Sequence, residues 1–349
     1  MNPLESLLPG LPLIVWQLVW ASIIVAFVTV FALIAVYLER KISAYAQDRY
    51  GPMEAGGWGF QGWAQTLADA IKLLLKEDII PALADPKLFK LAPYIVFAGS
   101  LGVLAVIPFA TTLVGSDLNI GIYYAVALSS TVVIGILMAG WASNNKWALY
   151  GAMRSAAQMI SYEIPISLSL MLPVMLAGSL SFNEIMEAQR TGFPGDGYFW
   201  NWYLFRVPPF TIIAFIIYFW ASLAETNRTP FDIPESESEL VAGYHTEYTG
   251  IRFAMFFLAE YANMFIVAAI ASVVFLGGAL APAPWLSFIP GPAWLILKAM
   301  VIVFVQIWLR WTLPRVRVDQ LMHICWKIFL PLALVNFIAI ATVAAIWQK

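Results

Sequence analysis

The sequence predicts an all-α polytopic membrane protein with eight transmembrane helices and an amphipathic helix in its first basic loop. Two observations support this fold class. Of the 349 residues, 61% are hydrophobic and only 11% are charged, whereas soluble proteins average about 25% charged residues. Long apolar segments also recur along the chain, and a bilayer core of about 30 Å needs roughly 20 apolar residues in a helix. So few charges cannot cover a surface that faces water, and most of the surface is expected to face lipid.

Eight apolar segments are expected to cross the membrane. In chain order they are 11–38, 91–116, 118–143, 160–182, 207–224, the two halves of 253–297, and 328–348. The stretch 253–297 is too long for one crossing, and its proline-rich centre at 282–292 divides it. An even number of spans places both chain ends on one side. Because the spans are distributed along the chain with no soluble domain between them, residues 1–349 are expected to form a single transmembrane domain.

The basic residues predict the orientation. All but four of the 19 Lys and Arg residues lie in or beside alternate loops. Those loops are 39–90, 144–159, 225–252 and 310–327. Because basic loops stay on the cytoplasmic side, these four are expected to face the cytoplasm, or the matrix in an organelle, with both termini on the opposite side. Within the first loop, the apolar residues of 60–78 recur at helical spacing, which predicts an amphipathic helix at the membrane surface.

Few residues are suited to redox or nucleotide chemistry. A single cysteine, Cys325, excludes a disulfide framework and a cysteine-ligated cluster within the chain. Two histidines are too few for a histidine-rich metal site, so no metal site is expected. The segment 57–62 matches G-x-G-x-x-G, but a nucleotide site would require a preceding strand and a parallel sheet. This segment is therefore expected to be an ordinary loop.

Three acidic residues lie in or at the edge of apolar segments, namely Glu163, Glu225 and Glu260. A charge at the bilayer centre costs at least about 2.5–3.5 kcal/mol, and such residues commonly mark a functional pathway. The alternative is that each carboxylate merely reaches the membrane interface. Glu260 lies about two turns inside its span, which favours the pathway for this residue most clearly.

The loop 225–247 holds six of the 21 acidic residues and one base, Arg228. The six are Glu225, Asp232, Glu235, Glu237, Glu239 and Glu247. Clustered carboxylates raise one another's pKa and can then exchange protons near neutral pH. A solvated acidic loop is the plain alternative, and composition does not separate the two. Because acids within apolar helices flank the loop on both sides, we favour proton exchange.

Several motifs resemble one known family. In chain order they are Glu39-Arg40-Lys41, Gln47–Pro52, Ala68–Leu73, Arg154–Glu163, Ala224–Gly243, Ala259-Glu260-Tyr261 and Arg310–Met322. They resemble the H subunit of bacterial respiratory complex I, whose mitochondrial counterpart is NADH dehydrogenase subunit 1. The resemblance runs from about residue 37 to the last span.

This resemblance implies site residues of two kinds. Positions that match residues lining or near the quinone chamber of the family are Arg40, Arg49, Asp69 and Arg310. Positions that match the family's acidic path from the chamber into the membrane are Glu163, Glu225, Arg228, Asp232, Glu235, Glu239 and Glu260. Glu237 and Glu247 match acidic loop positions with a less defined role.

The resemblance also implies partners and a place in the cell. Quinone would be the substrate, with iron–sulfur clusters and FMN in cluster-bearing hydrophilic partner subunits on the cytoplasmic side. Small and antiporter-like subunits would be partners within the bilayer, and no nucleic acid is involved. The expected location is the inner membrane of a bacterium, with periplasmic termini.

The expected function is that of the quinone-chamber and coupling subunit of a proton-pumping NADH:quinone oxidoreductase, with no redox centre of its own. The equivalent subunit of a membrane-bound hydrogenase is one alternative, and it would need no quinone. A free-standing ion transporter that uses the buried acids is another. A purely structural membrane anchor is a third, but it leaves the buried acids unexplained.

Overall fold

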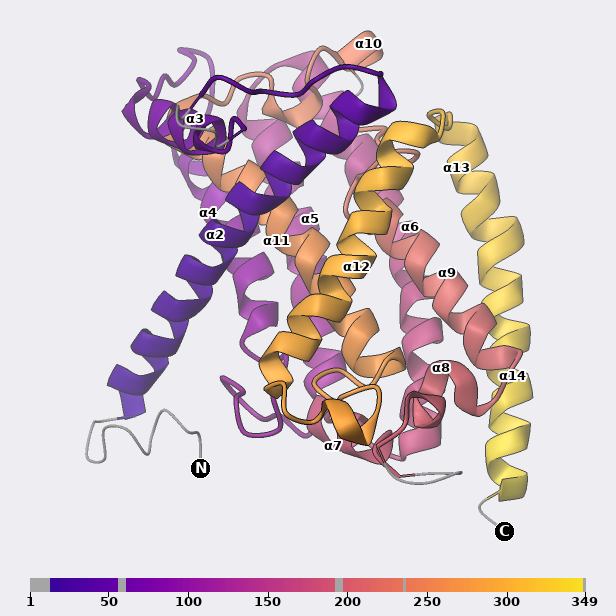
Figure 1. Cartoon of the computed structure of the whole chain (residues 1–349). Helices are drawn as coiled ribbons and strands as arrows, with labels where there is room; N and C mark the ends of the chain where they lie inside the picture. The colour runs from indigo at the N-terminus through magenta and orange to yellow at the C-terminus, as the bar shows by residue number, and fades with distance from the viewer. Residues whose placement is uncertain (1–12, 56–60, 192–196, 235–236, 348–349) are drawn as a thin grey trace.

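The structure, a computed structural model, describes residues 13–55, 61–191, 197–234 and 237–347. Over these residues the chain forms helices and no strand. The long helices run side by side as a bundle (Figure 1). They are α2 (Leu13–Ala46), α4 (Pro86–Leu104), α5 (Gly121–Ala142), α6 (Lys146–Ala177), α9 (Phe210–Glu225), α11 (Gly250–Phe275), α12 (Gly291–Thr312), and α13 (Val318–Ile324) with α14 (Leu330–Trp347).

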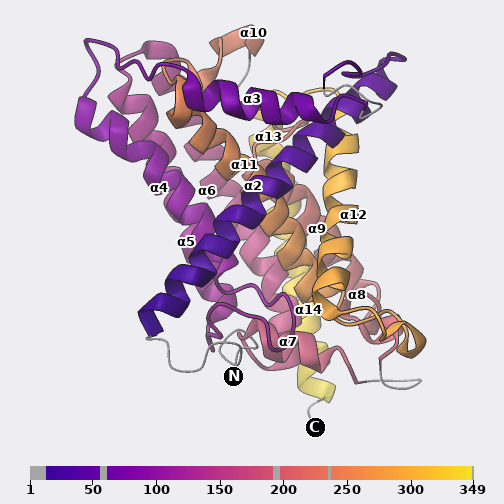
Figure 2. The same ribbon diagram turned by 60° about the vertical axis from the view of Figure 1, so that its left-hand side comes forward.

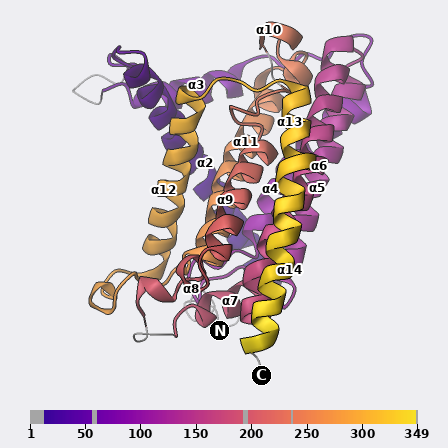
Figure 3. The same cartoon turned by 90° about the vertical axis from the view of Figure 1, so that its right-hand side faces the viewer.

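Seven helical segments among the described residues are long and apolar enough to cross a membrane. The last joins α13 and α14 through one π-turn, Cys325–Phe329, and Figure 3 shows the two as one continuous rod. The fifth predicted span, 207–224, corresponds to α9, which has only 16 residues and is about 24 Å long at 1.5 Å per residue. The prediction of an all-α polytopic membrane protein is confirmed.

Short helices cover the two ends of the bundle. We call the end that carries α3 (Ala64–Leu75) and α10 (Glu237–Leu240) the α3 end, and the end that carries α7 (Phe182–Ala188) and α8 (Tyr203–Arg206) the α7 end. Figure 2 shows α3 lying across its end of the bundle. This is the predicted amphipathic helix, and its apolar residues Leu67, Ile71, Leu74 and Leu75 are exposed. The described part of α2 begins at the α7 end, and the described part of α14 ends there.

Short one-turn helices complete the loops: Phe199–Asn201, Gly243–His245 and Pro284–Leu286. The second predicted span, 91–116, ends as a helix at Leu104. Beyond it the chain folds back, since the amide of Phe109 donates to the Leu113 carbonyl at 2.9 Å and that of Ser116 donates to the Ala105 carbonyl at 2.9 Å. Pro108 lacks the amide hydrogen that would continue the helix.

The predicted loop 144–159 is instead largely the first half of α6. The side chain of Asn145 caps this helix by accepting a hydrogen bond from the Trp147 amide at 2.9 Å. The capped helix continues for 32 residues, with Pro165 and Pro173 inside it. It ends at Gly178, whose φ of 72° suits glycine. The basic residues in this segment predicted which side of the membrane it faces, but they did not indicate whether the segment is a loop or part of a helix.

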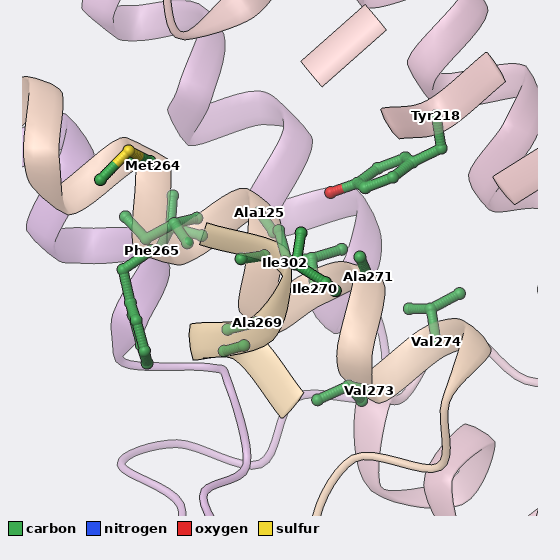
Figure 4. Close-up of a cluster of buried hydrophobic side chains, with 14 of the residues drawn as sticks. Ala125, Tyr218, Met264, Phe265, Ala269, Ile270, Ala271, Val273, Val274 and Ile302 are labelled. Atoms are coloured by element: carbon green, nitrogen blue, oxygen red, sulfur yellow. The ribbon is translucent and has the colours of Figure 1, made fainter. Parts of the chain in front are cut away.

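The central element is α11, which is the most buried of the long helices. It packs against α4, α12, α2 and α9. Small residues such as Ala262, Ala268 and Ala271 allow these helices to approach closely. Figure 4 shows the resulting core, with Phe265 and Val273 of α11 and Tyr218 of α9.

Both ends of α11 are held by polar contacts. At the α3 end, Arg252 pairs with Asp78 at 2.8 Å, and Gly250 adopts a φ of 58° beside the Lys76 carbonyl, where a Cβ would lie 2.9 Å from that oxygen. At the α7 end, the buried ammonium of Lys298 in α12 donates three hydrogen bonds. They go to the carbonyls of Leu276, Gly278 and Leu280, at 2.7, 2.9 and 2.7 Å. These carbonyls belong to the segment just after Phe275, the last residue of α11, and the negative end of a helix dipole favours a cation at this place.

Candidate functional site: a buried network of ionisable side chains

The carboxylate of Glu39, near the end of α2, lies at the centre of a buried network. Its side chain is 7% exposed. The guanidinium of Arg310 in α12 donates to its Oε1 atom. The hydroxyl of Tyr261 in α11 donates to Oε2 at 2.6 Å, and Arg228 donates to the same oxygen at 3.1 Å. Four segments far apart in the sequence therefore meet at one carboxylate.

Arg228 joins Glu39 to the acid of α11. Its Nε atom lies 2.9 Å from Oε1 of Glu260, and its guanidinium lies over the Tyr261 ring at 4.5 Å. Burial alone lowers the pKa of Arg228, but Glu260 and Glu39 more than offset this and hold that pKa well above its usual value. Arg228 is 2% exposed. Because arginine keeps its proton in proteins, Arg228 is a permanent positive charge between two carboxylates.

The loop after α9 is shaped by α6. The buried amide of Gln158 donates to the Ala224 and Phe231 carbonyls at 2.7 and 2.8 Å. It also donates to the side chain of Asn227 at 3.2 Å. Asn227 has a φ of 52°, which asparagine tolerates better than most residues. This turn aims the neighbouring Arg228 into the bundle.

The three acids of the spans lie along two small cavities. Glu163 and Glu225 line a cavity of ≈ 30 Å³. Glu225 and Glu260 line a second cavity of ≈ 20 Å³. Glu225 belongs to both, so the structure brings together the three acids that the sequence singled out.

Of the four residues expected near the quinone chamber, three lie at the α3 end in ion pairs. Arg40 follows Glu39 on the next face of α2 and pairs with Asp69 of α3 at 2.7 Å. Both side chains are more than a third exposed. Arg310 belongs to the Glu39 network, whereas Arg49 is exposed beyond the end of α2.

Two of the other acidic positions, Glu239 and Glu247, have partners outside the network. Glu239 pairs with Arg154 at 2.6 Å and is 56% exposed. The hydrogen bond from Arg154 holds the pKa of Glu239 below its usual value. Asp232 is half-buried within the loop that Gln158 holds, and Glu247 accepts a hydrogen bond from Asn145 at 2.7 Å. Glu235, the side chain of Glu237 and residues 57–60 of the glycine motif lie outside the described residues.

Sequence reasoning missed the residue at the centre of the network. Glu39 was noted only as part of a basic motif, although it is the first charge after an uncharged apolar segment. That position alone was a signal of the kind that identified Glu260. Tyr261 and Gln158 carried no such signal, because an uncharged polar residue in a helix is common. Over the described part of the chain, no group of three or more His, Cys, Asp and Glu is placed to hold a metal ion.

Comparisons with known proteins identify the family. The sequence model of the NADH dehydrogenase family matches residues 19–341. A protein of Chlorobaculum parvum, named as the H subunit of NADH-quinone oxidoreductase, is 53% identical over 338 residues, which cover 94% of this chain and 91% of that protein. This chain belongs to the family of NADH-quinone oxidoreductase H subunits.

Two further members of this family come from other bacteria. The protein of Brevibacillus brevis is 48% identical and covers 99% of this chain and 98% of its own length. That of Anaeromyxobacter dehalogenans is 46% identical and covers 95% of this chain and 81% of its own length. All three proteins are named as H subunits, and neither a hydrogenase nor a transporter is among them. The chain is therefore a multi-pass membrane subunit of complex I type, and the alternative functions are not favoured.

Proposed function

We propose that this chain helps to form the quinone chamber of a proton-pumping NADH:quinone oxidoreductase and passes the charge change of quinone reduction into the membrane. Its relatives are named as subunits of an NADH-quinone oxidoreductase. The chain would bind the quinone headgroup at the α3 end through Arg40, Arg49, Asp69 and Arg310. The acids Glu163, Glu225, Asp232, Glu235, Glu239 and Glu260, together with Arg228, would form the coupling path.

The observation that carries this proposal is the Glu39 network. It runs without a break from Arg310 through Glu39 and Arg228 to Glu260. Glu260 in turn lines the cavity that it shares with Glu225. A charge change beside Arg310 therefore meets a continuous set of buried charges that ends within the bilayer.

The electrostatics of such a network suit coupling. Removing one partner of a buried ion pair costs about 3–5 kcal/mol, because the other charge is left without compensation. Reduction of a quinone consumes two electrons and two protons, and proton uptake from nearby groups leaves negative charge in the chamber. If that charge draws Arg310 away, Glu39 must bind a proton or depend on Arg228 alone for compensation. Either response alters the pairing of Glu260.

The proposal includes partners and a location. Electrons would arrive from an iron–sulfur cluster in a hydrophilic partner subunit, with FMN further along that arm. Small and antiporter-like membrane subunits would receive the charge change. The α3 end would face the cytoplasm of a bacterium, and both termini would lie on the periplasmic side of its inner membrane.

The test replaces the three acids of the spans singly, as Glu163→Gln, Glu225→Gln and Glu260→Gln, in the intact complex. Glutamine keeps the shape but cannot carry a transferable proton. NADH:quinone turnover and proton uptake by sealed vesicles should fall together, while reduction of ferricyanide by NADH stays normal and shows that electron input is intact.

Glu247→Gln is the matched control, because Glu247 accepts its hydrogen bond from Asn145 outside the network. Near-normal turnover and pumping in all three span variants would overturn the acidic path.

A further inference from the structure

The two cavities share a second residue besides Glu225. Asn263 of α11 lines both the cavity beside Glu163 and the cavity beside Glu260. Asn263 and Glu260 stand three residues apart on α11, a spacing that puts both side chains on one face of a helix. Asn263 therefore stands beside Glu260 at the border of both cavities.

The size and lining of the cavities fit water. A cavity needs about 10–15 Å³ of free volume to hold one water molecule, and the water needs two to four polar partners. The first cavity, at ≈ 30 Å³, has room for two waters, and the second, at ≈ 20 Å³, has room for one. Ser129 and Tyr218 line the first cavity and Asn227 lines the second, in addition to the acids.

The polar groups around Asn263 are largely committed elsewhere. The Tyr218 hydroxyl donates to the Val267 carbonyl at 3.0 Å, and the Ser129 hydroxyl donates to the Val126 carbonyl at 2.9 Å. Among the described residues, no hydrogen bond engages the amide of Asn263. The side chain of Asn263 is partly buried, and its amide offers two donors and an acceptor to water in the two cavities.

We propose that Asn263 is a positioning residue for water, whose amide holds the water molecules that join the Glu163 cavity to the Glu260 cavity. This inference rests on the proposed function and deepens it. A carboxylic acid at one end of the water chain gives up a proton, each water passes one proton on, and a carboxylate at the other end takes one up. No group is oxidised or reduced, and each water is restored. Asn263 itself stays neutral throughout.

The experiment compares Asn263→Leu with Asn263→Ala in the intact complex. Leucine fills nearly the same volume without hydrogen-bonding groups, so it should exclude water and lower quinone-linked turnover and pumping about ten-fold or more. Alanine leaves space that water can occupy, so it should keep most of both activities. A packing role predicts the reverse order, because removing buried side-chain volume usually costs more than a volume-conserving exchange.

A second readout is the solvent isotope effect on turnover. If leucine interrupts a water chain, proton transfer becomes slow and the rate ratio between H₂O and D₂O should rise in Asn263→Leu. Asn336→Leu is the matched control, since Asn336 also lies in a span but is buried and donates to the Phe210 carbonyl outside both cavities. It should leave the isotope effect unchanged.

Two outcomes would overturn this inference. One is an alanine variant that is as impaired as the leucine variant or more so, and the other is a leucine variant with normal turnover and isotope effect. If the Glu→Gln variants lose activity while Asn263→Leu does not, the acidic path stands and only the role of Asn263 fails. If the Glu→Gln variants are silent, the path and this inference fail together.

Discussion

At the scale of single residues, Glu39 pairs with two arginines. Arg228 has Glu260 as a second carboxylate, whereas Arg310 forms its ion pair with Glu39. Glu39 thus contacts both Arg310, which we place beside the quinone, and Arg228, which leads to Glu260. Its charge, rather than its size, should decide its function.

We predict that Glu39→Gln lowers NADH:quinone turnover about ten-fold or more, since loss of a buried partner charge costs about 3–5 kcal/mol. Glutamine can still meet Tyr261 but leaves an uncompensated positive charge beside it. Glu39→Asp keeps the charge and should recover part of the activity. Ferricyanide reduction and the assembled complex on a native gel are the controls. Equal activity of the glutamine and wild-type complexes would contradict this role.

At the scale of elements, α10 docks on the bundle through the buried side chain of Leu240 and an ion pair between Glu239 and Arg154 of α6. The Arg154 guanidinium lowers the pKa of Glu239, so the charged form of Glu239 is the one that favours the docked helix. A lowered pKa contributes stability above the unfolded value of about 4.3, and that stability is lost as the pH falls through the lowered value. The effect is small, because Glu239 is more than half exposed.

We therefore predict that α10 opens more readily in acid. Hydrogen exchange of the segment 237–245, corrected for the intrinsic effect of pH on exchange, should accelerate below about pH 4. Glu239→Gln should exchange faster at neutral pH and show no such acceleration. An unchanged pH dependence in the glutamine variant would show that another group controls the opening.

The elements also show how far the sequence could predict the fold. Every expected span corresponds to a helix, because lipid leaves the backbone no other way to satisfy its hydrogen bonds. Helix ends were less accurate, as at Leu104 and Lys146. Apolar composition continues beyond Leu104 although the chain turns back, and a cap such as Asn145 is one polar residue among many.

At the scale of the whole molecule, the site depends on contacts that no local pattern contains. Glu39 and Arg310 are 271 residues apart in the chain, and Glu39 and Arg228 are 189 apart. The sequence could identify charged residues that are costly in a membrane, and the structure brings the span acids together. The sequence could not indicate which partner neutralises each charge, because that depends on how the helices pack.

The orientation of the bundle gives a prediction at the same scale. The single cysteine, Cys325, is buried, so Cys325→Ser provides a clean background for labelling. Trp285 lies in the loop between α11 and α12, and Leu83 lies between α3 and α4. Both side chains are exposed, so each position can be replaced by cysteine, as Trp285→Cys and Leu83→Cys. A maleimide that cannot cross membranes should label Trp285→Cys in intact cells and Leu83→Cys only after the membrane is opened. The opposite pattern would reverse the orientation.

The contact of Lys298 with the end of α11 has a mechanical consequence. Three hydrogen bonds fix that end of the helix to α12, whereas the opposite half carries Glu260 and Tyr261, whose partners are charges. These hydrogen bonds join carbonyls, which do not titrate, whereas an ion pair between Arg252 and Asp78, at 2.8 Å, holds the α3 end of the same helix. α11 has 26 residues, so its length is about 39 Å, and one degree of tilt about the Lys298 contact would displace its α3 end by about 0.7 Å. A tilt of α11 driven by a change of charge would therefore be smallest at Lys298 and would strain the Arg252–Asp78 ion pair most.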